Sequence, residues 1–361
     1  MGILDMLKRD CKSRRFKAWQ IEITTRCSLH CAMCIKTACK EWKRKDMSVD
    51  DFKKIFPYLH DVESVVLEGW GESLLHENLV DFIRLAKSAG PEVGFVTSGT
   101  GLNAEYARQV VDAGVDFMGF SLSGATAETH NAIRVNSDFD TLITSMQTVK
   151  TLSLKNPWKK PRLHIVYLML KENIHEIPIL LDLALTMGIN EIILLNIIQV
   201  TSRGQDSLKT FTCQDGFLYP NILKTAEDKA NKLKIKLSLP ASTPQDVAVC
   251  SENPLENVYI SADGEVSPCV FLQPPVTAPF TRIFCNTEYP TFPVSFGNVF
   301  RQSFETIWES DGYRKFRGAF VARQKRWKQA YESLLQLRPA DPSPLPEPPS
   351  PCRTCHKMLG F

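Results

Sequence analysis

The feature that most constrains the fold of this chain is a regular alternation of apolar, strand-like runs with amphipathic segments. The runs are rich in Val, Ile and Phe and occupy residues 18–24, 62–70, 93–99, 115–123, 163–170 and 191–200. Each run predicts a buried strand, and the amphipathic segments between them, several of which end at glycine, predict helices. Such an alternation indicates a parallel sheet with right-handed crossovers. The pattern leaves two architectures open, a doubly wound open sheet and an incomplete barrel.

The alternation stops near residue 200, and this divides the chain into four parts. We expect a basic N-terminal extension over residues 1–17, an α/β domain over 18–200, a bridging segment over 201–249 and a separate module over 250–361. The module begins with short strands, and Asp263-Gly264 marks a tight hairpin. It continues with a basic helical segment and a proline-rich linker. A length of 361 residues suits a barrel with an appended module.

The composition limits the partners and the compartment. The 43 Lys and Arg against 40 Asp and Glu leave a net charge of +3, which is too balanced to favour nucleic acid or an anionic membrane as a partner. No run approaches the roughly 18 apolar residues of a membrane span, and charged residues interrupt the N-terminal apolar ones before a signal peptide can form. We therefore expect a cytoplasmic protein, in which clustered cysteines bind metal rather than each other.

A cysteine cluster follows the first predicted strand. Cys27, Cys31 and Cys34 are separated by three and two residues in the segment RCSLHCAMC. Three thiolates in one loop cannot complete a tetrahedral zinc site or bind every iron of a cubane cluster, so one metal position stays open. A zinc knuckle that takes its fourth ligand from His30 or Cys39 is the alternative. The position at the carboxyl end of a parallel strand, where ligands collect, favours a catalytic site.

This spacing resembles that of the radical S-adenosylmethionine (SAM) enzymes. The resemblance covers roughly residues 18–200 and implies an incomplete (β/α)6 barrel, a partial form of the TIM barrel. It also implies that Cys27, Cys31 and Cys34 bind a [4Fe-4S] cluster whose fourth iron is chelated by the amino and carboxylate groups of SAM. Reductive cleavage of SAM would then yield a 5'-deoxyadenosyl radical that abstracts hydrogen from a substrate. Met33 would pack against the adenine.

Further residues resemble the SAM-binding positions of that superfamily. The segment from Glu68 to Glu72 resembles its Gly-Gly-Glu motif, in which glycine permits close approach to a ligand and the carboxylate suits the SAM ammonium group. The third and fourth strands end in hydroxyl residues, where serine replaces the commoner Asn and Asp, and an arginine follows that would reach the SAM carboxylate. The implied SAM-binding residues are Met33, Gly69, Trp70, Gly71, Glu72, Thr97, Ser98, Ser121, Ser123 and Arg134.

A second cysteine set lies in the C-terminal module. The thiolates of Cys250, Cys269, Cys352 and Cys355 would form a coordinatively closed site. Four cysteines bind structural zinc readily, which is one interpretation. The segment ISADGEVSPC and the terminal cysteine pair resemble the SPASM/twitch extension of radical SAM enzymes. That resemblance implies a small α+β domain with an auxiliary [4Fe-4S] cluster, and four cysteines match its one-cluster twitch form.

These sites predict a radical SAM oxidoreductase or maturase that acts on a small molecule or a short peptide. A closed auxiliary cluster suits electron acceptance, so we expect net oxidation of the substrate, with flavodoxin or ferredoxin as the electron donor. The alternatives are a peptide maturase and a redox-neutral epimerase, in which Cys213 or Cys285 would return a hydrogen atom to the substrate. Packing as small buried residues is the other role open to these two cysteines. A more distant alternative is a non-catalytic module with zinc at both cysteine sets.

Overall fold

The computed structural model describes residues 14–39, 41–155, 160–336 and 343–361. Its central element is a nine-stranded sheet with the strand order β11-β8-β7-β5-β4-β3-β1-β12-β13. The six predicted runs are confirmed as β1 (Phe16–Ile21), β3 (Val62–Val66), β4 (Glu92–Thr97), β5 (Phe117–Leu122), β7 (Arg162–Met169) and β8 (Glu191–Asn196). Neighbouring strands among these are all parallel, so their carboxyl ends lie at one edge of the sheet.

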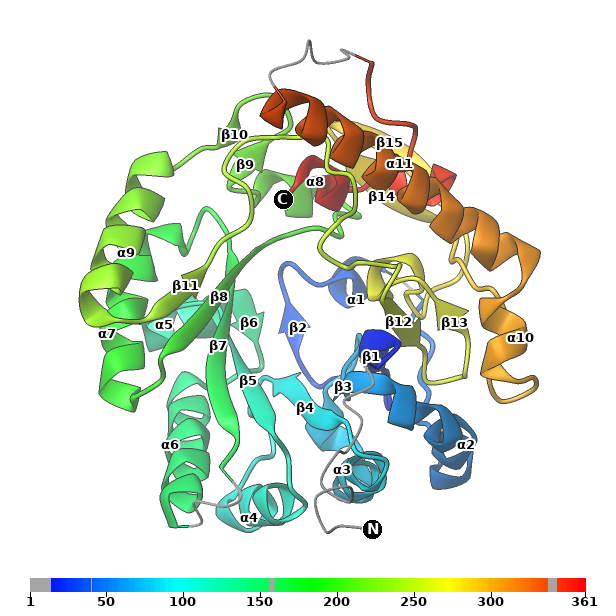
Figure 1. Cartoon of the computed structure of the whole chain (residues 1–361). Coiled ribbons are helices and arrows are strands. Elements are labelled where there is room, and N and C mark those ends of the chain that lie inside the picture. The colour runs from blue at the N-terminus through cyan, green and yellow to red at the C-terminus, as the bar shows by residue number, and fades with distance from the viewer. Residues whose placement is uncertain (1–13, 40, 156–159, 337–342) are drawn as a thin grey trace, which may run out of the picture.

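Helices connect these strands and cover the outer face of the curved sheet (Figure 1). They include α2 (Val49–Ile55), α3 (Leu79–Ser88), α4 (Ala104–Asp112), α6 (Phe139–Lys155) and α7 (Ile177–Met187). Each of α2 and α3 buries an apolar side, and the rings of Phe52 and Phe82 pack with their centroids 4.7 Å apart. The side chains of Ser48 and Asn103 cap the N-termini of α2 and α4. Helices outside a curved parallel sheet make the incomplete barrel that the resemblance implied.

The sheet extends beyond the predicted boundaries of the barrel at both edges. In the predicted bridge, α9 (Pro220–Leu233) leads to β11 (Lys236–Ser238), which pairs in parallel with β8. At the other edge, β12 (Asn257–Ile260) of the C-terminal module pairs in parallel with β1, and β13 (Val266–Ser267) pairs antiparallel with β12. The strand β11 is three residues long and lacks an apolar run, so a search for buried strands misses it.

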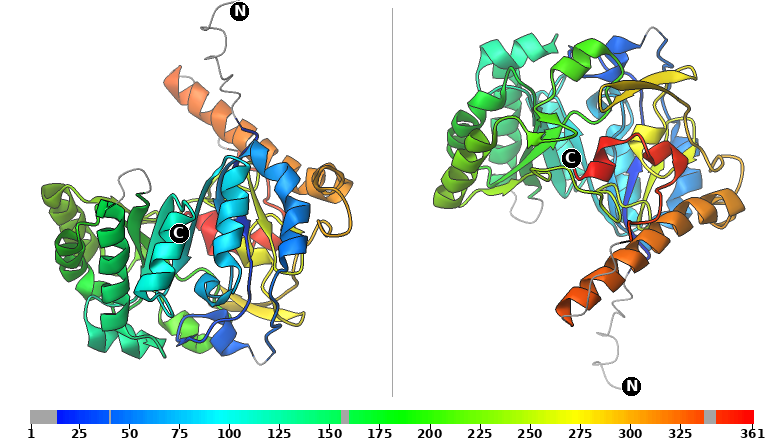
Figure 2. Two further views of the ribbon diagram at one scale, coloured as in Figure 1. Left: turned by 90° about the horizontal axis from the view of Figure 1, so that it is seen from below. Right: turned by 90° about the horizontal axis from the view of Figure 1, so that it is seen from above.

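The C-terminal module combines short strands with one long helix. The hairpin of β12 and β13 turns at Asp263-Gly264 as predicted, and Gly264 has a φ of 86°, which glycine adopts without strain. A second hairpin consists of β14 (Phe280–Phe284) and β15 (Thr287–Thr291). The basic segment forms α11 (Asp311–Leu335), which follows α10 (Phe304–Trp308) and projects from the body of the molecule at its far end (Figure 2).

Shorter elements complete the described fold. They are β2 (His30–Cys31), α1 (Ile35–Ala38), α5 (Ala127–Ile133), β6 (Arg134–Val135), α8 (Arg203–Ser207), β9 (Phe211–Thr212) and β10 (Gly216–Phe217). Short 3-10 turns occupy residues 56–61, 73–75, 174–176, 270–272, 350–352 and 356–359. Most of the predicted N-terminal extension, including Cys11, and residues 339–342 of the predicted linker lie outside the described residues. Within the described residues, no helix combines the length and apolarity that a membrane crossing requires.

Candidate active site

The cluster loop, residues 22–34, connects β1 to α1 and carries Cys27, Cys31 and Cys34. Its strand β2 pairs with β6, so that Cys31 stands opposite Arg134. The backbone N–H of Ala32 donates to the last carbonyl of α5 at 2.9 Å, and that of Cys34 donates to the carbonyl of Cys31 at 3.1 Å. These backbone bonds hold the loop at the carboxyl end of β1.

The thiols of the cluster loop suit an iron–sulfur cluster. Cys27, Cys31 and Cys34 are all free of disulfide bonds. Burial, with a smaller contribution from the thiolates of Cys31 and Cys27, raises the pKa of Cys34 to about 11. Burial also raises the pKa of Cys27. Thiolates that are close enough to repel one another are stabilised by a shared positive metal centre, and three of them leave one iron of a cubane open.

The two glycines of the Gly-Gly-Glu motif lie where another part of the chain packs too closely for a side chain. A Cβ atom on Gly69 would lie 2.5 Å from the side chain of Glu22, and one on Gly71 would lie 2.1 Å from the carbonyl oxygen of Thr24. The backbone N–H of Glu72 donates to the carbonyl of Arg26, next to the first cysteine, at 2.8 Å. The segment after β3 therefore packs directly on the cluster loop, and only glycine permits this approach.

Glu72 is buried, and its carboxylate accepts four hydrogen bonds from this chain. Oε1 accepts from Thr97 Oγ1 at 2.7 Å and from the N–H of Leu74 at 3.2 Å. Oε2 accepts from the N–H and the hydroxyl of Ser98 at 2.8 and 2.7 Å. A carboxylate has about four lone-pair positions, so these bonds use all of them. The structure brings Glu72, Thr97 and Ser98 together as partners of one another, at the carboxyl end of β4.

Two further predicted residues, Ser123 after β5 and Arg134 after α5, contact each other. Arg134 Nε donates to Ser123 Oγ at 2.8 Å. Asn173, which the sequence did not reveal, is fully buried and donates from its amide to the carbonyls of Ser123 and Leu168 at 3.0 and 2.9 Å. It thereby connects the ends of β5 and β7. Ser121 is half-buried on β5.

Glu22 is a buried carboxylate that the motifs did not reveal. Its Oε1 accepts from the N–H of Trp70 at 2.7 Å, and its Oε2 accepts from the N–H of Ala262 at 3.3 Å. It therefore joins the glycine motif to the hairpin of the C-terminal module. Burial raises its pKa to about 7. The signal in the sequence is a glutamate inside the otherwise apolar run 18–24.

Trp70 lies between the two cysteine sets. Trp70 and Cys34 both pack against the buried cluster of Ile35, Val276 and Phe280. Trp70 Nε1 donates to the carbonyl of Val270, the residue that follows Cys269, at 3.2 Å. Its ring centroid lies 6.3 Å from that of Phe271. Trp70 thus connects the glycine motif to the C-terminal module at this point.

The four cysteines of the second set lie near enough for their thiolates to repel one another. Cys250, Cys269, Cys352 and Cys355 are all free. Burial raises the pKa of Cys250 to about 12 and also raises the pKa values of Cys269 and Cys352, and repulsion from other thiolates of the set adds to each. Arg282 donates to the carbonyl just before Cys352 at 2.9 Å and so holds the terminal pair. This donor set fits a metal centre that neutralises four thiolates.

In the described part of the chain, no three His, Cys, Asp or Glu side chains are arranged to hold a single metal ion. The thiolates that bind a cubane cluster each bind a different iron, so they need not converge on one point.

Cys213 and Cys285 are joined by a disulfide bond, which corrects the expectation of a free thiol at either position. Cys213 follows β9, and Cys285 lies in the turn between β14 and β15. Their Cα atoms are 5.5 Å apart, although 72 residues separate them in the sequence. In the disulfide neither sulfur carries a hydrogen atom, so neither cysteine can serve as the hydrogen donor. Only the fold brings these two hairpins together.

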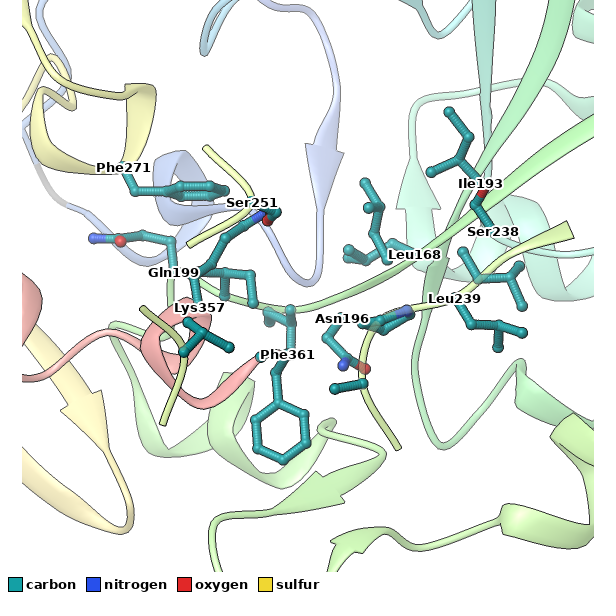
Figure 3. Close-up of a pocket in the computed structure, with 18 of the residues that line it drawn as sticks. Leu168, Ile193, Asn196, Gln199, Ser238, Leu239, Ser251, Phe271, Lys357 and Phe361 are labelled. Atoms are coloured by element: carbon teal, nitrogen blue, oxygen red, sulfur yellow. The ribbon is translucent and has the colours of Figure 1, made fainter. Parts of the chain in front are cut away.

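A cavity of about 740 Å³ opens between the carboxyl ends of the barrel strands and the C-terminal module (Figure 3). Met33 and Trp70 border it on the side of the cluster loop. Leu168, Phe271 and Phe361 contribute to its largely apolar wall. A cavity with apolar walls and a few polar groups, next to the predicted cofactor, is suited to a substrate.

Three polar side chains of the cavity wall were not predicted from the sequence. Asn196 and Gln199 interrupt the apolar run at the end of β8, which is a signal that could have revealed them. Lys357 follows the terminal cysteine pair, and its Nζ donates to Glu252 Oε1 at 2.6 Å and to Ser251 Oγ at 2.9 Å. Burial opposes the charge of Lys357, but the carboxylate of Glu252 outweighs it and the pKa of Lys357 is raised.

Two family models match the chain. The model of the radical SAM superfamily matches residues 21–184, and the model of the iron-sulfur cluster-binding domain SPASM matches residues 250–356. The first range contains the cysteines of the cluster loop, and the second contains all four cysteines of the second set.

Individual relatives span most of the chain. It is 27% identical over 310 residues to the tungsten-containing aldehyde ferredoxin oxidoreductase cofactor-modifying protein of Pyrococcus furiosus, and the match covers 82% of each chain. It is 22% identical over 325 residues, 84% of each chain, to the AdoMet-dependent heme synthase of Methanosarcina barkeri. The fold is similar to that of SuiB from Streptococcus suis bound to its precursor peptide SuiA, with a TM-score of 0.59 and 12% identity over 96% of this chain and 71% of SuiB.

Proposed function

Because the chain belongs to the radical SAM superfamily and carries a SPASM iron–sulfur cluster-binding domain, we propose that it oxidises a short peptide or a small molecule in the cavity between its two cysteine sets. Cys27, Cys31 and Cys34 would hold a [4Fe-4S] cluster, and the chemistry that this cluster would supply is reductive cleavage of SAM, which would provide a 5'-deoxyadenosyl radical for hydrogen abstraction from the substrate. The position of the cavity carries this proposal. Met33 borders it beside the first cysteine set, and Phe271 borders it beside the second.

The residues of this chain would hold SAM at the carboxyl ends of the first four barrel strands. Met33 and Trp70 would pack against SAM, because both border the cavity next to the cluster loop. Arg134 stands opposite Cys31 and suits the SAM carboxylate. Glu72 would act by holding the end of β4, since its own carboxylate is occupied by hydrogen bonds.

Net oxidation is supported by the second cysteine set and by the disulfide. Four thiolates would complete the coordination of an auxiliary cluster, which would then supply an electron acceptor for the substrate rather than a binding site for it. In total the substrate loses a hydrogen atom to the cleaved SAM, then one electron to that acceptor and one proton to solvent or a base. Redox-neutral epimerisation would need a hydrogen donor, and while the disulfide is intact neither Cys213 nor Cys285 carries a thiol hydrogen atom to donate.

A short peptide is supported as a substrate by the likeness to SuiB, which has been solved with a precursor peptide. A small molecule is supported by the size of the cavity, about 740 Å³. We further propose a cytoplasmic location, with flavodoxin or ferredoxin as the electron donor.

The assignment of the two cysteine sets is tested by replacing Cys27, Cys31 and Cys34 together with Ala. Because the two sets share no ligand, the variant should release no 5'-deoxyadenosine from SAM but keep the iron of the auxiliary cluster. Anaerobic purification, iron analysis and product chromatography measure both. Cys39→Ala is the matched control, since Cys39 is a free cysteine packed beside the cluster loop. A folded triple variant without iron, or a colourless native protein that holds zinc, would overturn the assignment.

Oxidation is tested by turnover in deuterated water, once peptides or small molecules have been screened for SAM-dependent conversion. Oxidation predicts a product that has lost two hydrogen atoms. Solvent deuterium at an otherwise unchanged carbon would instead demonstrate epimerisation and refute the oxidation proposal.

A further inference from the structure

The cavity wall at the end of β8 carries hydrogen-bond donors without partners. Asn196 and Gln199 line the cavity and are 3% and 5% exposed. Within the described residues, Asn196 Nδ2 and Gln199 Nε2 have no hydrogen-bond partner. Buried amide groups are rarely left unpaired, because their desolvation is then uncompensated. Two such groups beside one cavity, each reached by a ligand once its side chain turns toward the cavity, point to a ligand that accepts hydrogen bonds.

The orientation of the Asn196 amide is set by a neighbour. Thr210 Oγ1 donates to Asn196 Oδ1 at 3.3 Å. The oxygen of this amide is therefore satisfied within the protein, and the nitrogen is the group that lacks a partner. A ligand at this position must supply an oxygen or another acceptor.

Lys357 provides a third donor on the same cavity (Figure 3). Its ammonium group has three N–H bonds, of which two point to Glu252 and Ser251. Phe271 lies near the ammonium, which is 5.5 Å from the ring centroid. The third N–H is thus available to a ligand. Because Glu252 balances the charge of Lys357, the pair gives little net attraction for a carboxylate.

We propose that Asn196, Gln199 and Lys357 form a substrate subsite for neutral carbonyl oxygens, in a ligand whose apolar part packs on the cavity walls. The donors select an acceptor, the balanced ion pair favours a neutral amide over a carboxylate, and Leu168 and Phe361 supply apolar contact. The subsite rests on the proposed function, whose substrate it describes. A neutral carbonyl beside an apolar group occurs both in peptides and in small amides.

The subsite is tested by calorimetric titration of the anaerobic holoenzyme, with SAM present and no reductant, so that no turnover occurs. The probes are N-acetyl-Leu-Phe-amide, 2-naphthamide and 2-naphthoate. The isosteric variants Asn196→Asp and Gln199→Glu replace an amide donor by an acceptor and should weaken binding of the amides roughly tenfold each. Gln324→Leu, at an exposed position on α11, is the control. Iron content and melting temperature establish that each variant is folded.

Each outcome bears on the subsite. Amide binding that weakens in both variants but not in the control supports it. Tighter binding of the dipeptide amide identifies a peptide source, and equal binding of 2-naphthamide identifies small amides. The proposal would be overturned if neither amide binds, if the two variants bind the amides as tightly as the native protein does, or if the protein prefers 2-naphthoate. If the variants are too unstable, Gln199→Leu, which removes the whole amide with its unpaired donor at a similar side-chain volume, must give the same loss. A native enzyme that binds amides but never cleaves SAM would refute the proposed function and not the subsite.

Discussion

Replacing Glu72 with Gln should destabilise the protein rather than only weaken SAM binding. The carboxylate accepts hydrogen bonds from Thr97, Leu74 and Ser98, and it is 5% exposed. In the Gln variant one oxygen can still accept from Thr97 and Leu74. The amide NH2 group then faces Ser98, and the backbone N–H of Ser98 loses its acceptor.

The size of the effect follows from the bonds that are lost. A hydrogen bond to a charged group contributes about 1.5–3 kcal/mol, and a buried N–H left without an acceptor costs about 1–3 kcal/mol. Since the hydroxyl of Ser98 can turn to accept from the new amide, we expect a net loss of about 3 kcal/mol. For a domain of this size the melting temperature should fall by roughly 5 °C.

The assay is thermal unfolding of the anaerobic holoenzyme, together with equilibrium dialysis of SAM. Glu77→Gln is the matched control, because Glu77 is exposed and five positions along the same segment. A direct contact between Glu72 and the SAM ammonium predicts a different pattern, in which SAM affinity falls by roughly tenfold to a hundredfold at unchanged melting temperature. That pattern would refute the positioning role argued above.

Two further variants test the packing and the electrostatics of the site. Gly71→Ala should prevent assembly of the catalytic cluster, because the Cβ atom of Ala would lie 2.1 Å from the backbone of Thr24. Visible absorption and iron content measure the assembly. The control is Gly312→Ala, whose Cβ would lie 3.5 Å from its nearest neighbour, and this variant should assemble the cluster normally. Burial raises the pKa of Glu22 from 4.5 to about 7, so the folded state holds the Glu22 proton more tightly than the unfolded state does. The stability that this proton contributes is therefore lost as the pH rises through the pKa of the folded state. Between pH 6 and pH 8 the native protein should lose about 1.4 kcal/mol relative to Glu22→Gln, and parallel pH dependences of melting temperature would contradict this.

Local patterns in the sequence predicted the parallel strands, the crossover helices and the cysteine cluster at residues 27–34. A buried strand needs a largely apolar run, and the six predicted runs became β1, β3, β4, β5, β7 and β8. The spacing of Cys27, Cys31 and Cys34 expresses a chemical requirement within one loop, so it can be recognised without a fold. The SAM-binding roles of the surrounding residues stay predictions.

The tertiary structure alone decided the contacts between segments that are distant in the sequence. The disulfide between Cys213 and Cys285 depends on two hairpins that meet only in the folded chain, and no local pattern marks either partner. The same holds for β12, which adds to β1 at the edge of the barrel, and for the cavity that Asn196 and Lys357 share. Periodicity and motif spacing report which side chains a segment buries and which ligands one loop offers. Periodicity and spacing carry no information about which distant segment forms the opposite wall of the cavity, because that depends on packing over the whole chain.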